Sequence, residues 1–172
     1  MPDMLFKIIE PFGPSAGAAW DQYVQWRKFH FTAFDSIDGM LRPSLFVPET
    51  AEDWENCINA DYRTDLITSL DYAKTLLTKY EKADLIGVQP DINAESRLAE
   101  HLLGFDIIDG YSDVSLLTNW GAEDIDVINR QLQPNGLIGD AESALELRDY
   151  LQNHYPNDSH AACCSVWAIY RV

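Results

Sequence analysis

Basic residues are scarce in this sequence. Its 172 residues include 28 Asp and Glu but only 12 Lys and Arg, so the formal net charge at pH 7 is −16. The imbalance is strongest in residues 87–172, where 14 acidic and four basic residues give −10. Such a surface repels phosphate backbones and anionic lipid headgroups, so we expect neither nucleic acid nor a membrane as a partner. A basic macromolecule would instead be attracted at long range.

Cysteines and long apolar runs are also few. The three cysteines, Cys57, Cys163 and Cys164, form no even-numbered framework, which favours a reducing compartment over a disulfide-stabilised fold. No apolar run approaches the ~18 residues that a membrane-spanning helix needs, and the N-terminal segment does not have the pattern of a signal peptide. By elimination we expect a cytoplasmic location.

Motifs of the common catalytic and cofactor sites are missing. The sequence contains no G-x-S-x-G, P-loop, G-x-G-x-x-G or H-E-x-x-H pattern. The one cluster of zinc-ligand residue types comprises His154, His160, Cys163 and Cys164. Zinc ligands are normally paired at both ends with short spacers, and adjacent cysteines on a strand point to opposite faces. We therefore expect no catalytic residue, no bound metal and no cofactor.

The sequence does have ample material for a core, with 47% hydrophobic and 12% aromatic residues. Its patterning predicts an α+β fold in which residues 1–172 form a single compact domain. We expect a central sheet of about four to six strands with helices packed on it. The predicted strands are 4–9, 84–89, an extended stretch over 105–117 broken at Gly110, and 163–171. The predicted helices are 15–31, 50–58, 61–81, 94–103, 122–132 and 140–153.

Two of these elements are expected to build the core. Helix 61–81 carries an apolar stripe from Leu66 to Leu77 at helical spacing, so it should pack on the sheet. Strand 163–171 is too apolar to lie in water, so it should run inside the sheet, with the alternate residues from Cys164 to Tyr170 on one face.

Two further clusters allow more than one interpretation. Residues 104–119 are rich in Asp, Ser and Asn, and Asp106, Asp109 and Asp113 could surround a divalent cation. Their spacing does not match a calcium loop, and carboxylates that accept backbone amide hydrogens in turns explain them as well. The second cluster is aromatic, and its six rings could form core, pocket or interface. They belong to Trp20, Tyr23, Trp26, Phe29, Phe31 and Phe34.

Four segments resemble a group of small uncharacterised bacterial proteins, some of which are suspected immunity proteins that neutralise a toxin by binding it. The segments are 103–109 (LGFDIID), 115–119 (SLLTN), 135–138 (NGLI) and 166–172 (VWAIYRV). Many of those proteins have Cys-Gly where this chain has Trp120-Gly121, so the resemblance implies no role for a cysteine there. It covers about residues 103–172, and it implies a binding function, since the group has no established active site.

These observations favour a non-catalytic, acidic binding protein, of immunity or inhibitor type, that neutralises a basic protein partner. The residues expected to bind that partner are Asp113, Glu123, Asp126, Glu146 and Asp149. One alternative is a small metal-assisted enzyme that uses Asp106, Asp109 and Asp113. Another is an oligomeric structural protein with the aromatic N-terminal segment as its interface.

Overall fold

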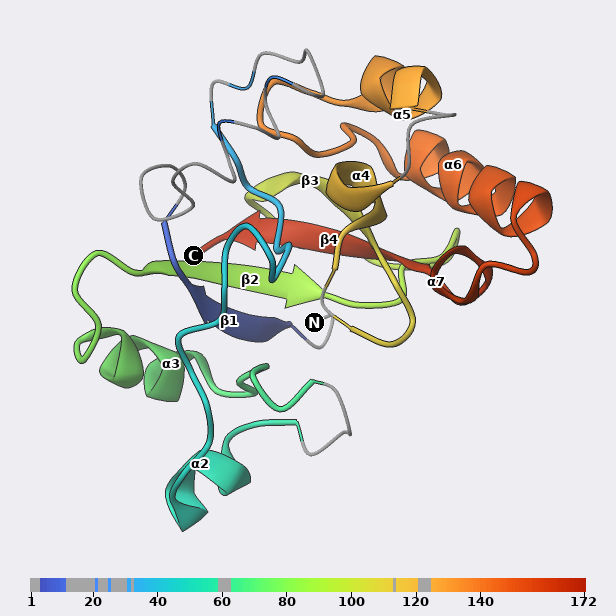
Figure 1. Ribbon diagram of the computed structural model, residues 1–172. Helices are drawn as coiled ribbons and strands as arrows, with labels where there is room; N and C mark the ends of the chain where they lie inside the picture. The colour runs from blue at the N-terminus through green and yellow to red at the C-terminus, as the bar shows by residue number, and fades with distance from the viewer. Residues whose placement is uncertain are drawn as a thin grey trace.

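A four-stranded antiparallel sheet, in the order β1-β2-β4-β3, forms the centre of the computed structural model (Figure 1). The structure describes residues 4–11, 21, 25, 31, 33–58, 63–112, 114–120 and 125–172. The strands are β1 (Leu5–Ile9), β2 (Asp84–Gln89), β3 (Leu102–Ile108) and β4 (Ser165–Arg171). The helices are α2 (Ala51–Glu55), α3 (Leu70–Leu77), α4 (Leu116–Asn119), α5 (Ile125–Gln131), α6 (Ala141–His154) and α7 (Ser159–Ala162). The α+β class and the expected number of strands are confirmed.

The C-terminal strand β4 lies inside the sheet, as the sequence predicts, with β2 on one side and β3 on the other. The side chains on its two faces pack in two different hydrophobic clusters. Val166, Ala168 and Tyr170 pack in one cluster with residues of β3, α4 and α6. Trp167 and Ile169 pack in a second cluster on the opposite face. This alternation follows from the two-residue period of a strand, and burial on both faces explains the continuous apolar run.

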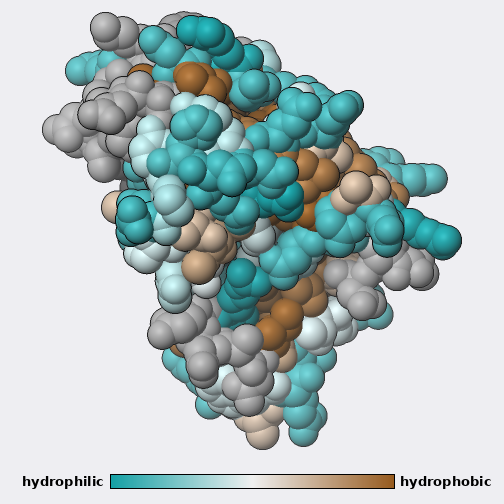
Figure 2. Space-filling model, turned by 90° about the vertical axis from the view of Figure 1, so that its right-hand side faces the viewer, coloured by the Kyte–Doolittle hydropathy of each residue, from teal (hydrophilic) through white to brown (hydrophobic). Residues whose placement is uncertain are grey.

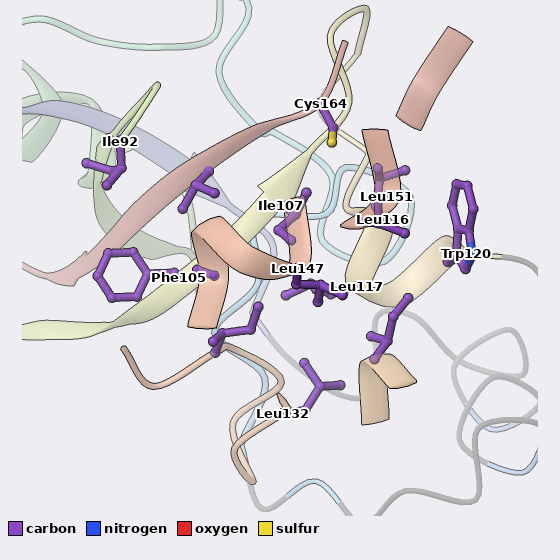
Figure 3. Close-up of a cluster of buried hydrophobic side chains, with 14 of the residues drawn as sticks. Ile92, Phe105, Ile107, Leu116, Leu117, Trp120, Leu132, Leu147, Leu151 and Cys164 are labelled. Carbon is purple, nitrogen blue, oxygen red and sulfur yellow. The ribbon is translucent and has the colours of Figure 1, made fainter. Parts of the chain in front are cut away.

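Helices α4 and α6 cover one face of β3 and β4 (Figure 1). Figure 3 shows Leu116 and Leu117 of α4, and Leu147 and Leu151 of α6, gathered around Ile107 of β3. These side chains are almost completely removed from solvent. Burying one such aliphatic side chain is worth about 1.5–3 kcal/mol, so this layer holds α6 firmly on the sheet.

Both outer edges of the sheet already have backbone partners. Beside β1, Phe6 pairs with Ile67, and Ile9 with Ser44. Beside β3, Phe105 pairs with Ile138, and Ile108 with Ser115. Short bridges of this kind protect an edge strand from pairing with another chain. In the part of the chain that the structure describes, the sheet therefore offers no long open edge.

The predicted helix 61–81 is wrong in length. The structure has α3 only from Leu70 to Leu77, with Ser69 as its N-cap. Ile67 is instead bridged to Phe6 of β1, and Asp65 lies 2.9 Å from the buried ammonium group of Lys7. These contacts with β1 hold residues 65–67 in a non-helical conformation. The expected packing on the sheet is confirmed, because α3 lies against β1 and β2.

The predicted helix 94–103 is also wrong. Residues 94–101 form no helix, and β3 begins at Leu102. Gly104, expected to end that helix, lies within β3 with a φ of +149°, a region that favours glycine. A Cβ atom there would come within 2.8 Å of the Leu137 side chain, so the glycine also permits the close approach of segment 135–138.

Other predicted elements are shifted or only partly described. Residues 116 and 117, expected to be extended, lie instead in α4. Helix α5 begins at Ile125 and agrees with the predicted helix over its described residues. Most of the predicted helix 15–31 lies outside the described residues, where only Asp21 and Gln25 are assigned as helical. No helix among the described residues is long and apolar enough to span a membrane.

Candidate binding groove on α6

Asp106 of β3 is completely buried and holds two distant segments together. Its Oδ2 accepts hydrogen bonds from Ser36 Oγ at 2.6 Å and from the backbone N–H of Ile37 at 3.3 Å. Its Oδ1 accepts a hydrogen bond from the hydroxyl of Ser115. Burial raises the pKa of Asp106 to about 6, although these hydrogen bonds oppose the rise. The carboxylate thus anchors the segment around Ser36 and the start of α4 to β3.

A second buried carboxylate, Asp38, lies beside this network. Its Oδ2 accepts hydrogen bonds from the backbone N–H of Ser115 at 2.9 Å, from Thr118 Oγ1 at 2.6 Å and from the side-chain amide of Asn119. Its Oδ1 accepts the backbone N–H groups of residues 40 and 41. Burial raises the pKa of Asp38 above its ordinary value. Because protein groups occupy both oxygens, the arrangement is that of a structural clamp on the N-terminal end of α4.

Asp109 accepts hydrogen bonds within a turn, which is the second of the two interpretations of the acidic segment 104–119. It accepts the backbone N–H of Tyr111 at 2.8 Å and both the N–H and hydroxyl of Ser112. His160 Nδ1 lies 3.1 Å from its Oδ2. Burial alone would raise the pKa of Asp109, but these hydrogen bonds together lower it. Asp106 and Asp109 therefore have separate sets of partners, and Asp113 lies outside the described residues.

The zinc-type cluster is not assembled in the described residues. Cys164 is buried, and burial raises the pKa of its thiol to about 11, while the neighbouring Cys163 is exposed. His154 stacks on the ring of Tyr150, with the two ring centroids 4.0 Å apart. Among the residues that the structure describes, no group of three or more His, Cys, Asp or Glu side chains could hold a metal ion.

Two of the predicted partner-binding residues, Glu146 and Asp149, line one groove. It has a volume of about 450 Å³ and runs between α6 and the segment 92–98. The remaining lining side chains are mostly small or apolar, and Leu98 is 41% exposed. They include Ile92, Ala94 and Leu98 on one wall, and Ala141 and Leu145 on α6. Figure 2, which shows one face of the molecule, illustrates how apolar side chains reach the surface in a band between hydrophilic ones.

The groove is acidic because of the way α6 is placed. Asp140 is its N-cap and accepts the backbone N–H of Ser143 at 2.8 Å. With Ala144, Leu147 and Leu151 facing the sheet, the opposite side of α6 carries Glu142, Glu146 and Asp149 into the groove. Arg148 pairs with Asp149 at 2.5 Å, whereas Glu142 and Glu146 form no ion pair with any residue that the structure describes. The wall therefore keeps a net negative charge.

The other predicted partner-binding residues are not brought to this groove. Asp126 is exposed on α5 and is not among the groove residues. Asp113 and Glu123 lie outside the described residues. Sequence reasoning missed the wall formed by Ile92, Ala94 and Leu98, because it placed residues 94–103 in a helix. The signal that could have found it is Pro90 followed by Asp91 and Asn93, a typical turn composition.

A second cavity, of about 410 Å³, lies between α2 and α3. Asp53 is one of its lining residues, forms a capping box with Thr50 and accepts a hydrogen bond from the hydroxyl of Tyr72 at 2.5 Å. These hydrogen bonds, that from Tyr72 first, hold the pKa of Asp53 well below its ordinary value. Because Oδ2 of Asp53 accepts hydrogen bonds at the start of α2 and Oδ1 accepts that from Tyr72 of α3, we assign this carboxylate a structural role.

The aromatic segment is described only at its end. Phe34 is buried, and its ring meets that of Phe31 edge to face with centroids 5.8 Å apart. Trp20, Tyr23, Trp26 and Phe29 lie outside the described residues. The core interpretation is thus supported for the two described rings, because Phe34 is buried and Phe31 packs, partly buried, against the main core cluster.

Comparisons with protein-family models, with curated proteins and with solved structures found no match for this chain.

Proposed function

We propose that this protein is a non-catalytic binding protein that captures a basic macromolecule in the groove along α6. The observation that supports this most directly is the coincidence of three carboxylates with an otherwise largely apolar groove of about 450 Å³. An apolar centre supplies binding free energy, and charges at its border supply attraction and orientation. Neutralising a basic toxin in the cytoplasm is the role that the resemblance to suspected immunity proteins suggests.

The contrast among the carboxylates supports binding rather than catalysis. Asp38 and Asp106 are fully buried and accept several hydrogen bonds each. Glu142 and Glu146 are exposed, so an incoming cation can reach them without displacing a protein donor. A partner with Lys or Arg at matching positions would gain most from these free groups.

The test is to isolate the partner and then measure how charge controls its association. Partners are recovered from the native host at low salt, and the association rate of a purified partner is followed as salt is raised. Electrostatic steering predicts a basic partner whose association slows by about tenfold or more between low and high salt.

A charge-matched pair of variants makes the test specific. Glu146→Lys with Asp149→Lys should weaken binding strongly. Glu55→Lys with Glu81→Lys changes the net charge equally at exposed positions near α2 and α3, and should weaken it much less. The proposal would be contradicted by a partner that binds the two double variants equally well and whose association does not change with salt concentration.

A further inference from the structure

The wall that α6 contributes to the groove consists of two neighbouring rows of side chains. Ala141, Leu145 and Asp149 form one row at steps of four residues, and Glu142 and Glu146 form the next. On an α-helix such rows are ridges with a furrow between them. Side chains of a second helix fit into this furrow, because their own rows repeat with the same spacing. The exposed side of α6 is therefore shaped to receive another helix.

The two rows differ in chemistry. Ala141 and Leu145 are half-buried against the core, whereas Glu142 and Glu146 are exposed. Ala141 is small, which lets a second backbone approach closely. Across the groove, Ala94 and Leu98 form an apolar wall next to the buried Ile92. An occupant must therefore be apolar where it faces Leu98 and Leu145, and basic along the flank that faces Glu142 and Glu146.

An extended occupant lacks a comparable fit. Peptides that bind as strands pair with an open sheet edge. In the described part of the chain, the outer edges of β1 and β3 are already bridged to other segments. The groove itself is bounded by α6 and a non-helical segment, neither of which is a strand.

We propose that the groove binds an amphipathic helix of the partner, with Leu or a similar residue on its inner face and Lys or Arg along one flank. This inference rests on the proposed function and adds the form of the ligand. The helix lies across α6 with its ridge in the furrow between the two rows, about 8–10 Å from the axis of α6. It covers Leu98, which is 41% exposed in the free protein.

Two synthetic peptides of identical composition test this. One has Leu at helical spacing with Lys along one flank, and the other has its Leu at every second position. Their affinities for the full chain are measured by fluorescence anisotropy at low salt. The peptide with the helical pattern should bind about tenfold more tightly, because only a helix with this pattern places its Leu side chains on one face and its Lys side chains along the neighbouring flank.

Variants locate the binding site. Leu98→Ser should weaken binding of the helical peptide about fivefold, because it removes an apolar contact. Met40→Ser is the matched control, since Met40 is 68% exposed and lies outside the groove. An unchanged thermal unfolding curve shows that each variant is folded.

The outcomes separate this inference from the proposed function. Equal affinities for the two peptides, or no effect of Leu98→Ser, would overturn the helix inference. If Glu146→Lys still weakens binding in that case, the basic-partner proposal stands. If neither peptide binds, or if Glu146→Lys changes neither affinity, both proposals fail.

Discussion

The carboxylates at the junction of β3 and α4 and those in the α6 groove are the same chemical group in opposite environments. Asp38 and Asp106 are completely removed from solvent and accept hydrogen bonds from segments far apart in the chain. Glu142 and Glu146 are exposed on one helix. The buried pair fixes the position of loops on the sheet, whereas the exposed pair remains free to meet a ligand. Acidity alone therefore identifies neither group, and the protein donors around each carboxylate distinguish them.

The largest expected effect on the free energy of unfolding comes from removing the buried carboxylate of Asp38. Asp38→Ala removes the acceptor of the backbone N–H groups of Ser115 and Met40, and it leaves the hydroxyl of Thr118 and the amide of Asn119 with the backbone oxygen of Ser115 as their remaining main-chain acceptor. Unsatisfied buried groups cost about 1–3 kcal/mol each, so we expect the free energy of unfolding to fall by about 3–5 kcal/mol. Urea unfolding measures this. Asp126→Ala, at an exposed position, is the control. Equal losses of unfolding free energy in the two variants would contradict the distinction between buried structural carboxylates and exposed ones.

A pH series sharpens the comparison through Asp106. The pKa of Asp106 in the folded protein is about 6, above its ordinary value of 3.8, so the folded state binds this proton more tightly than the unfolded state does. The stabilisation that results is fully present below pH ~4 and is lost as the pH rises through about 6. Asp106→Asn removes this titration. The stability of the variant relative to the unmodified protein should therefore increase by up to about 3 kcal/mol between pH 4 and pH 7. Parallel stability curves would show that Asp106 does not titrate in this window.

Asp140→Asn provides a control of opposite sign. Hydrogen bonds from Ser143 lower the pKa of Asp140, so its contribution to stability is present above its ordinary pKa and is lost as the pH falls. Asn is an equally good N-cap, which keeps the helix start intact. The stability of this variant relative to the unmodified protein should thus rise, not fall, as the solution becomes more acidic.

The smallest expected effect is in the groove. Glu146→Lys changes an exposed side chain whose carboxylate has no ion pair or hydrogen bond with the described part of the chain, so the free energy of unfolding should change by less than about 0.5 kcal/mol. Chemical denaturation checks this, with Asp38→Ala as the contrasting variant. A loss of 2 kcal/mol or more, taking ~1 kcal/mol as the ordinary effect of a mutation, would mean that Glu146 has a structural role.

Local signals predicted some parts of the fold well. The predicted helix starts at residues 50 and 140 agree with the structure, where Thr50 and Asp53 form a capping box at the start of α2 and Asp140 caps α6, because these interactions involve residues only three apart. The alternation in β4 likewise predicted its two faces, and its apolar character predicted its interior position. The groove was harder to predict, since only its α6 wall came from a correctly assigned element.

Contacts between distant segments account for the errors. Residues 65–67 have a helical pattern, but Phe6 and Lys7 hold them against β1. Gly104 resembles a helix C-cap, but the backbone of segment 137–138 passes so close that only glycine fits in β3. A propensity of a few tenths of a kcal/mol per residue cannot outweigh such tertiary contacts.

The sequence by itself determined the acidic charge, the α+β class, the starts of α2 and α6 and the interior position of the last strand, because each depends on composition or on neighbours along the chain. Only the tertiary structure decided which carboxylates are buried. Asp38 and Asp106 became structural because Ser36, Ser115 and Thr118, which lie as much as 80 residues away, supply their hydrogen bonds. Glu146 remained available because α6 turns Leu147 and Leu151, not its acidic row, toward the sheet. Burial is a property of the assembled layers, and no stretch of the chain carries it alone.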